Sequence, residues 1–198
     1  MKFVVFSLFL VIFDLCIAQE KEYLAELQQH RKAIDLKFAD EEESPLEEND
    51  LRDFKNLDYF EADPKFRLKA KFVRTPNTPL FAMPTTTLRL PLYRKYAEIY
   101  FSLNGKKYKL DCYQNQELIS DPEYHDYLFL PFTDLTNGET TYSGGRYLDL
   151  RIPEGDSIIL DFNKTYNPYC AYNGEYSCPV VPNENHLEIP VAAGVKKF

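Results

Sequence analysis

The sequence lacks the features that assign many proteins to a functional class at once. Its 23 Lys and Arg residues are outnumbered by 31 Asp and Glu residues, the net charge is −8, and the lysines are scattered. Without a basic patch to neutralise phosphates, the chain is a poor nucleic-acid binder. Its few cysteines and histidines match no compact zinc-binding pattern. There is no internal repeat and no domain-splitting linker, so the sequence alone does not reveal a specific activity.

Long hydrophobic runs are also lacking, and the longest one lies at the N-terminus. Lys2 precedes an apolar stretch at residues 3–13 and a small-residue cleavage site. The stretch is too short for a membrane span and has no stop-transfer flank, so residues 1–18 are predicted to be a secretory signal peptide. We therefore expect an exported protein, periplasmic or secreted, with no transmembrane segment in the mature chain. Lipid anchoring at Cys16 is less favoured, because a lipidated cysteine wants a small residue before it and Leu15 stands there.

Two helices are predicted ahead of the first strand. Apolar residues at three-and-four spacing, with no Gly or Pro, indicate a helix over residues 19–39. Ser44 can cap a second, short helix, with Pro45 at its first position and Glu47 reaching back to the cap amide. The acidic run at residues 40–50 is expected to be a solvated linker rather than a calcium or partner site.

After these helices the hydrophobic period changes to two. Alternation at residues 66–72 predicts a half-buried strand, and alternation at 87–92 predicts an edge strand or bulge because that stretch contains a proline. The clearest element is a hairpin over residues 97–112, where the Asn-Gly pair at 104–105 favours a two-residue type I′ turn. The resulting register places Cys112 on the core side, as a small buried hydrophobe.

Several further short strands complete the predicted fold. They lie at residues 127–132, 146–152, 157–162 and 187–191. The second and third of them flank a turn at 153–156 and are expected to form another hairpin. Short strands with polar turns after an N-terminal helix indicate a mainly β fold, an antiparallel β sandwich or partly closed barrel with one or two N-terminal helices. We expect residues 19–56 to form a helical segment packed on a β domain at 57–198.

The segment at residues 162–190 is rich in cysteine, tyrosine, proline and asparagine, and something must pin its shape. Cys170 and Cys178 are separated by seven residues that include a turn, and in an oxidising compartment they are predicted to form a disulfide. Two alternatives stay open. The pair could bind a metal together with His186, or one thiol could be a nucleophile with a histidine as its base.

A second group of polar residues surrounds three glycines between residues 132 and 149. Its carboxylates could do acid–base work while an arginine holds an anion. Alternatively, these are turn residues, and Arg146 pairs with Asp149 or Asp161. The group consists of Asp134, Glu139, Tyr142, Arg146 and Asp149.

The most specific motifs of the chain are Asp161-Phe162-Asn163, Asn167-Pro168-Tyr169-Cys170-Ala171-Tyr172 and Ser177-Cys178-Pro179, and others extend from His30-Arg31 to Glu184-Asn185. Taken in order, they resemble an uncharacterised prokaryotic family catalogued as "domain of unknown function 1684", over nearly the whole mature chain. The family has no established activity, so the resemblance implies no catalytic residue. It does imply a set of polar positions that could form a ligand site, namely His30, Arg31, Asp134, Glu139, Tyr142, Arg146, Asp149, Asn163, Asn167, Glu184 and Asn185, beside the two cysteines.

Two functions follow as hypotheses. The first is a β-rich binding or structural module for a small polar ligand, a glycan or a partner, since tyrosine and asparagine offer amphipathic surface and hydrogen bonds. The second is a hydrolase that uses Glu139, Asp149 or Glu184 as acid or base, with Arg146 holding an anionic group. No cofactor and no metal is predicted for either.

Overall fold

The computed structural model describes residues 18–198 in full. Residues 1–17, which contain Cys16 and nearly all of the predicted signal peptide, lie outside them. The helices and strands are α1 (Lys2–Phe38), α2 (Glu48–Asp53), β1 (Arg67–Arg74), β2 (Leu80–Ala82), β3 (Leu92–Leu103), β4 (Lys106–Asn115), β5 (Tyr127–Asp134), β6 (Arg146–Arg151), β7 (Ser157–Asp161) and β8 (His186–Leu187). Short 3₁₀ turns follow at η1 (Pro64–Phe66), η2 (Phe162–Lys164), η3 (Tyr169–Ala171) and η4 (Asn183–Asn185).

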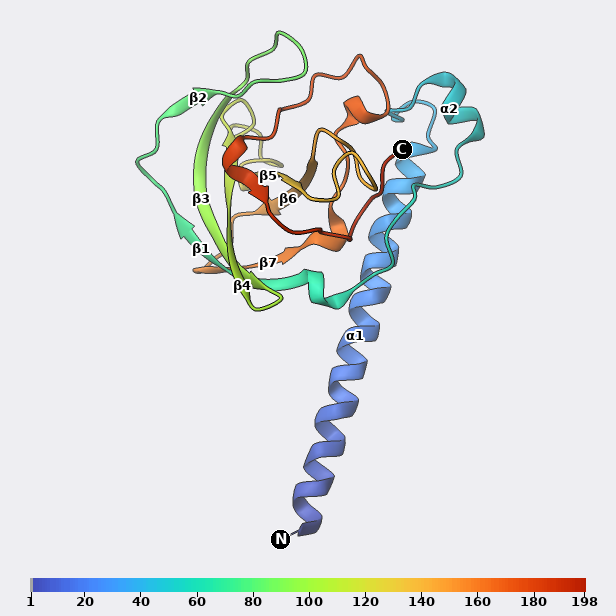
Figure 1. The fold of residues 1–198 in the computed structure, drawn as a ribbon, viewed down its shortest axis with the longest axis vertical. Coiled ribbons are helices and arrows are strands. Elements are labelled where there is room, and N and C mark those ends of the chain that lie inside the picture. Colours follow the sequence, from blue (N-terminus) through green and yellow to red (C-terminus); the bar gives the residue numbers. More distant parts are fainter. Residues whose placement is uncertain (1) are drawn as a thin grey trace.

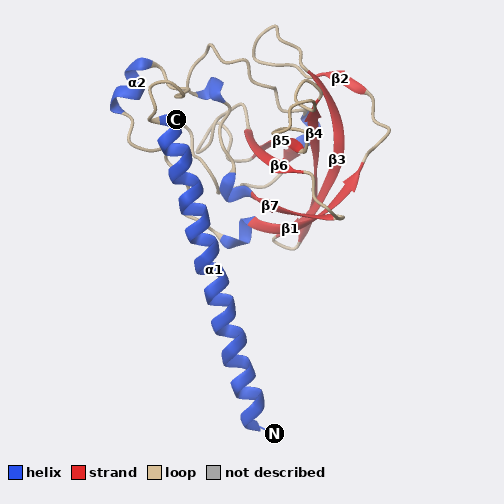
Figure 2. Cartoon of the chain, turned by 180° about the vertical axis from the view of Figure 1, so that it is seen from behind, coloured by secondary structure: helices blue, strands red, loops and turns tan. Residues whose placement is uncertain are grey.

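The strands form one curled sheet. Its order is β6-β5-β4-β3-β1-β7 with antiparallel neighbours, while β2 pairs with β3 and β8 runs parallel to β5. The sheet curls into a half-barrel whose end strands, β6 and β7, are not paired with each other (Figures 1 and 2). Its main core includes Ile99, Leu110, Leu130, Leu160 and Phe162. The predicted mainly β class is therefore confirmed, in the form of a partly closed barrel.

The opposite face of the sheet carries a second apolar cluster. Tyr93, Phe129 and Tyr147 lie there because side chains alternate between the two faces along β3, β5 and β6. The C-terminal segment 166–181 covers this cluster. Its first residue exchanges backbone hydrogen bonds with Tyr147, and the Tyr147 hydroxyl donates to the carbonyl of Pro179. The first half of the edge strand β6 is therefore buried on both faces, whereas Asp149 and Arg151 in its second half are exposed.

The hairpin predicted from the Asn-Gly pair is confirmed. Asn104 and Gly105 have φ angles of 52° and 76°, as the type I′ turn requires. Strands β3 and β4 pair in the predicted register, with Ala97 opposite Cys112. Cys112 is fully buried, and burial raises the pKa of its thiol to about 12.

The second predicted hairpin is wrong. β6 pairs with β5, and β7 pairs with β1, so the turn between them joins the two ends of the sheet. The backbone groups at the two ends of the turn are used elsewhere: Ile152 N donates to the carbonyl of Asp126, and the carbonyl of Asp156 accepts from Phe72 N. A local turn signal cannot show that more distant strands compete for the same edge.

Three other expectations need correction. The strand predicted at 87–92 is a loop in which Leu88 is 99% exposed, because no apolar surface lies opposite it. The strand predicted at 187–191 is reduced to the two residues of β8. Ser44 does not cap α2, which begins at Glu48; its hydroxyl instead donates to the carbonyl of Phe38 at 2.6 Å and closes the end of α1.

Helix α1 packs along the open side of the half-barrel, beside η2 (Figure 2). Tyr23 donates to the carboxylate of Asp161 at 3.1 Å, where β7 ends. One turn before the helix ends, Asp35 Oδ1 accepts from Leu57 N at 3.0 Å and from the Tyr59 hydroxyl at 3.2 Å. These bonds hold α1 in place beside η2, at the open side of the half-barrel.

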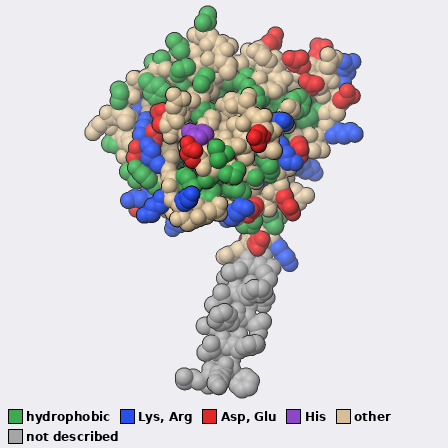
Figure 3. Space-filling model, viewed as in Figure 1, with side chains coloured by type: hydrophobic (Ala, Val, Ile, Leu, Met, Phe, Trp, Pro, Cys, Tyr) green, Lys and Arg blue, Asp and Glu red, His purple; other side chains and the backbone are tan. Residues whose placement is uncertain are grey.

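The surface of the domain mixes both signs of charge. Acidic side chains gather over α2 and the turn before it, which agrees with the largely exposed residues of the acidic run at 40–50 (Figure 3). Within residues 18–198, no helix has the length and apolar character that crossing a membrane demands.

Candidate functional site

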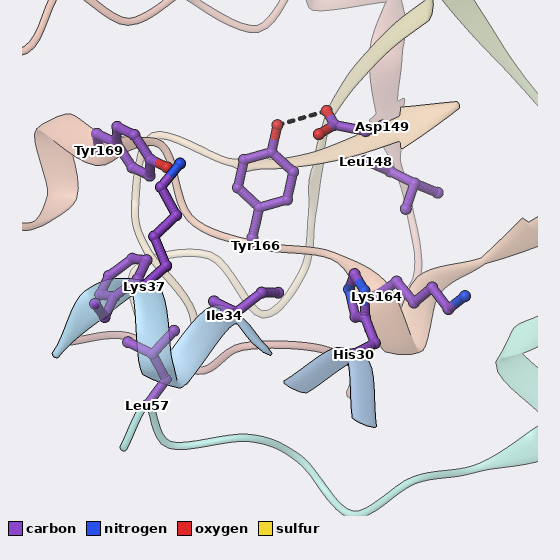
Figure 4. A pocket seen from close by; sticks show the side chains of 10 residues that line it. His30, Ile34, Lys37, Leu57, Leu148, Asp149, Lys164, Tyr166 and Tyr169 are labelled. Atoms are coloured by element: carbon purple, nitrogen blue, oxygen red, sulfur yellow. Dashed lines mark hydrogen bonds between the residues drawn. The ribbon is translucent and has the colours of Figure 1, made fainter. Parts of the chain in front are cut away.

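Asp149 lies where three parts of the chain meet. Alternation along β6 turns its side chain away from the main core, toward α1 and the segment 166–181. Tyr166 donates to Asp149 Oδ1 at 2.6 Å (Figure 4), and Tyr127 donates to the same oxygen at 2.8 Å. The carboxylate is therefore held in one orientation by two phenolic donors from different elements.

The pKa of Asp149 is raised, which is unusual for a carboxylate that contacts solvent. The side chain of Asp149 is exposed to solvent, although it lines two hollows whose walls bring many protein atoms near its carboxyl group. Burial raises the pKa of Asp149, against the hydrogen bonds from Tyr166 and Tyr127 and the positive field of Arg151 and His30, which lower it. The Asp149 carboxyl group therefore holds a proton to a higher pH than an ordinary surface carboxylate does.

A cavity of about 270 Å³ lies between α1 and β6, and we call it the helix-side cavity. Its walls are largely apolar, and its polar groups are Asp149 on one side and His30, Lys37 and Lys164 on the other (Figure 4). The residues that line it are His30, Ile34, Lys37, Phe38, Leu57, Leu148, Asp149, Lys164, Tyr166 and Tyr169.

His30 is the polar group that most needs a partner in this cavity. Its Nε2 atom is buried and has no hydrogen-bond partner among residues 18–198. Burial, and next the charge of Lys164, lower the pKa of His30. The imidazole is therefore neutral at pH 7 and can either donate or accept a hydrogen bond.

A second hollow, of about 340 Å³, lies on the other side of Asp149, between the sheet and the covering segment 166–181. We call it the tyrosine groove. Tyr166, Tyr169 and Asp149 line both hollows, so these three residues form the wall between the helix-side cavity and the tyrosine groove. Tyr93, Tyr127, Tyr147 and Tyr176 supply further walls of the groove, with Phe129 and Cys178 beside them.

Arg146 and Asp134 form a buried ion pair rather than a ligand site. Arg146 is fully buried and donates to Asp134 Oδ2 and to the carbonyl of Val191, both at 2.7 Å, and to the carbonyl of Ala193. Asp134 Oδ1 also accepts from Val191 N at 3.1 Å. The pair clamps the C-terminal tail to β5 and β6, and its guanidinium has no exposed surface with which to hold an anion.

Comparison with known proteins gives the family of the chain. A family model described as "Protein of unknown function (DUF1684)" matches residues 52–196. The chain belongs to this family. A solution NMR structure of an uncharacterized protein from Haloarcula marismortui is similar to it, with a TM-score of 0.70 and 32% sequence identity over 90% of this chain and 96% of that chain. No curated protein matches the chain.

The predicted membership of the DUF1684 family is thus confirmed, and with it comes no activity. The family match begins after α1, so His30 and Arg31 lie outside it. Arg31 has a structural contact of its own, since its guanidinium stacks over the ring of Tyr59 at 4.6 Å and donates to the carbonyl of Phe60 at 3.1 Å. It helps hold the chain that leads from α2 to β1.

Three asparagines of the DUF1684 pattern are buried and tie distant segments together. Asn163 pairs with the backbone of Asp63, receiving its N–H at 3.0 Å and donating to its carbonyl at 2.9 Å. Asn185 bridges β4 and β5 through the backbone of Asp111 and the carbonyl of Pro131. Asn167 donates to the carbonyl of Lys196 at 2.8 Å. Their amides serve the fold, because each matches backbone groups that would otherwise be unpaired.

The carboxylates of the hydrolase hypothesis are not brought together. Glu139 and Glu184 are exposed, and neither lines the helix-side cavity or the tyrosine groove. Glu184 accepts a long bond from the Tyr113 hydroxyl at 3.4 Å. Arg146 is enclosed in the core. Of the residues in the hydrolase hypothesis, all of which lie within the described residues 18–198, only Asp149 lines the helix-side cavity.

The disulfide predicted between Cys170 and Cys178 is not shown, since both are free thiols. They do lie together: Cys170 N donates to Cys178 Sγ at 3.1 Å, and the Tyr142 hydroxyl is 3.9 Å from Cys170 Sγ. Burial raises the pKa of Cys178 to about 12, which disfavours a thiolate nucleophile. Among residues 18–198, no three side chains of metal-ligand type gather, so His186 does not complete a site with the two cysteines.

Several residues of the two hollows were missed by sequence reasoning. Lys37 and Lys164 are single lysines without a motif, and the tyrosines of the groove are dispersed between residues 93 and 176. The high tyrosine content, with 15 in the chain, was the only available signal. Their convergence depends on the curl of the sheet and on the path of its covering segment.

Proposed function

We propose that this protein is a binding module that holds a small organic ligand in the helix-side cavity. The observation that supports this most directly is the buried, unpartnered Nε2 of His30 in a cavity that Asp149 closes on the other side. Apolar walls with a few convergent polar groups are the usual composition of a ligand site. Leaving such a buried nitrogen unpaired costs free energy that a ligand would recover.

The lining indicates what such a ligand would present. Its body would contact Ile34, Phe38 and Leu148, which are apolar. One polar group would bond to His30, and it would favour a hydroxyl or carboxylate because the ammonium of Lys164 lies nearby. This agrees with the small polar ligand expected from the sequence and adds an apolar body to it.

Binding fits these residues better than hydrolysis does. A carboxylate pair for acid–base chemistry needs two carboxyl groups within reach of one bond. Asp149 is the single carboxylate of the cavity, and Arg146 is committed to Asp134. We therefore assign Asp149 a role in holding ligand rather than in breaking a bond.

A fragment screen by NMR on the full chain tests the proposal. The probes are small aromatic carboxylic acids, sugars and nucleosides, and the readout is the His30 imidazole resonance. Binding in the cavity should shift that resonance in the parent protein, and His30→Gln, followed by the backbone amide resonances of Leu148 and Asp149, should bind about ten-fold more weakly, the effect of one good hydrogen bond. The matched control is His125→Gln, since His125 is exposed and contacts the carbonyl of Pro122. Ligands that leave His30 unshifted, or no ligand at all, would overturn the proposal.

We also propose that the protein is exported and that Cys170 and Cys178 become a disulfide in an oxidising compartment. The contact between the Cys170 amide and the Cys178 sulfur supports this, since it brings the two residues close. Cleavage after residue 18 would keep every part of α1 that lines the cavity. Intact mass of the protein from its native host, before and after reduction, should show loss of the first 18 residues and a gain of two hydrogens on reduction. A full-length chain with unchanged mass on reduction would refute both parts.

A further inference from the structure

The tyrosine groove has a composition that the helix-side cavity does not share. It lies between the outer face of β3, β5 and β6 and the covering segment 166–181, and it has a volume of about 340 Å³. Aromatic rings form most of its walls, with six tyrosines and one phenylalanine. The residues that line it are Tyr93, Leu118, Tyr127, Phe129, Tyr147, Asp149, Tyr166, Pro168, Tyr169, Tyr176, Ser177, Cys178 and Pro179.

The rings are arranged as walls rather than as a stack. Tyr147 and Tyr166 lie at 89° to each other with centroids 5.9 Å apart, and Tyr169 and Tyr176 lie at 72° with centroids 5.2 Å apart. Phe129 meets Tyr147 at 78°. These edge-to-face contacts hold the rings at steep angles to one another, so the aromatic surface that lines the groove is turned in several directions, as a cage around a cation requires.

The charge in the groove has a single sign. Asp149 is its only ionisable carboxylate, and no Lys, Arg or His is among the residues that line it. The nearest arginine on the same strand, Arg151, is occupied by the carboxylate of Asp126 at 2.7 Å and the carbonyl of Glu123 at 2.6 Å. Burial raises the pKa of Tyr147 and of Tyr166, so these phenols are neutral. A positive ligand would therefore meet a carboxylate and no cation among the lining residues; the cations nearest to the groove are Arg151, 6.0 Å from the Tyr127 ring, and Lys37, 6.0 Å from the Tyr169 ring.

We propose that the tyrosine groove is a binding site for an organic ammonium group, with Asp149 as its counter-ion and the tyrosine rings as its cage. This site is distinct from the ligand site proposed in the helix-side cavity, where the ammonium groups of Lys37 and Lys164 would repel a cation. Each aromatic face adds attraction for a cation that is larger when the site is shielded from water. The shared residue Asp149 faces both hollows, but the tyrosines at the far side of the groove belong to it alone.

The test uses the full chain with choline as probe and its uncharged carbon analogue, 3,3-dimethyl-1-butanol, as the matched ligand control. Backbone NMR shifts locate the binding, and titration gives both affinities. Choline should shift residues of the groove and bind about ten-fold or more tightly than the analogue, the gain expected from caging a charge. The His30 resonance should move little, which separates this site from the helix-side cavity.

Variants of Tyr176 decide the role of the rings. Tyr176 is half-buried and lines the groove but not the helix-side cavity, so its replacement reaches that cavity only through its edge contact with Tyr169. Tyr176→Leu should weaken choline binding several-fold, and Tyr176→Phe should retain most of it. Tyr100→Leu is the matched control, since Tyr100 is 41% exposed and outside the groove. Equal affinity for choline and the analogue, no shift in groove residues at tens of millimolar choline, or equal effects of Tyr176→Leu and Tyr100→Leu would each overturn the proposal.

Discussion

The hydroxyl of Tyr166 donates to Asp149 Oδ1 over 2.6 Å, and this bond forms the partition between the two hollows of the protein. Tyr166 comes from the covering segment and Asp149 from the edge strand β6, so the contact joins the two parts that create both spaces. A change at Asp149 should therefore affect stability and binding together, in opposite directions.

Asp149→Asn should raise thermal stability at pH 7 and leave it close to that of the parent near pH 3.5. Because burial raises the pKa of Asp149 in the folded state, its protonated form is favoured by folding. In the parent protein, this contribution to stability is lost as the pH rises from the pKa of Asp149 in the unfolded chain, about 3.9, to its higher pKa in the folded protein. The asparagine does not titrate, and its carbonyl can still accept from Tyr127 and Tyr166. Because the carboxylate is partly screened by solvent, we expect a modest rise in melting temperature for Asp149→Asn, about 2–4 °C at pH 7, measured by calorimetry.

The same variant should bind choline at least ten-fold more weakly, because it removes the counter-ion of the groove. Asp156→Asn is the control, since Asp156 is exposed in the turn between β6 and β7. A parent protein that is more stable than Asp149→Asn at every pH would show that the carboxylate is stabilising, contrary to the assignment.

Choline affinity should fall as pH is lowered, starting at a higher pH than an ordinary aspartate would give. The cation needs the ionised form of Asp149, and burial raises the pKa of that carboxyl. Tyr127 and Tyr166 face it as neutral donors, and Arg151 faces it as a constant positive charge. Calorimetric titration with choline between pH 4 and 8 measures the midpoint.

His30 and Lys164 face Asp149 from α1 and η2 and need their own control. Burial lowers the pKa of His30, so His30 gains charge only at a pH below its ordinary value. His30→Gln should therefore leave choline affinity unchanged in the upper part of the pH range. Asp149→Asn should make choline affinity nearly independent of pH. A profile that keeps its shape in Asp149→Asn would assign the titration to another group.

Strand pairings that a local turn determines could be predicted from the sequence, whereas pairings between distant segments could not. The hairpin of β3 and β4 was predictable to the residue, because Asn104 and Gly105 fix the turn and the turn fixes the register. The pairing of β6 and β7 was not, since each strand found a partner from another part of the chain. Likewise, residues 87–92 alternate between apolar and polar side chains but form a loop, because no apolar surface lies opposite Leu88.

The candidate site follows the same rule. His30 and Asp149 were among the polar positions named from the family resemblance, and both line the helix-side cavity. Most of the others, such as Arg146 and Asn185, are buried in bonds to backbone or to each other. A polar residue that holds the fold and one that holds a ligand look alike in a single sequence. Only burial and partners in the folded chain distinguish them.

Arg146→Met should destabilise the protein by about 3–5 kcal/mol, because it leaves the Asp134 carboxylate buried without its counter-charge. Both side chains of this pair have no exposed surface, so solvent cannot compensate for the loss. Urea unfolding measures the change. The double variant Asp134→Asn with Arg146→Met should recover part of the stability, since it removes the unpaired charge.

The exposed ion pair between Arg89 and Glu117, with an N–O distance of 3.0 Å and side chains 55% and 54% exposed, offers the matched control. Arg89→Met should cost less than about 1 kcal/mol. If Arg146→Met cost no more than Arg89→Met, Arg146 would be free for a ligand, and the hydrolase hypothesis from the sequence would regain its anion-holding residue.

Gly145→Ala should be strongly destabilising even though it adds a single methyl group. Gly145 has a φ of +92°, and a Cβ there would stand 2.7 Å from the carbonyl oxygen of Phe132 and 2.7 Å from Cγ2 of Val181. The backbone strain alone is worth about 1–3 kcal/mol, and the clash adds to it because β5 cannot retreat without disturbing Arg146. Gly155→Ala is the control, since a Cβ at Gly155 meets no atom within 4 Å. Thermal unfolding of the two variants should differ by several degrees; equal melting temperatures would mean that β5 and the covering segment yield at this point, and that the walls of the tyrosine groove are less rigid than its geometry requires.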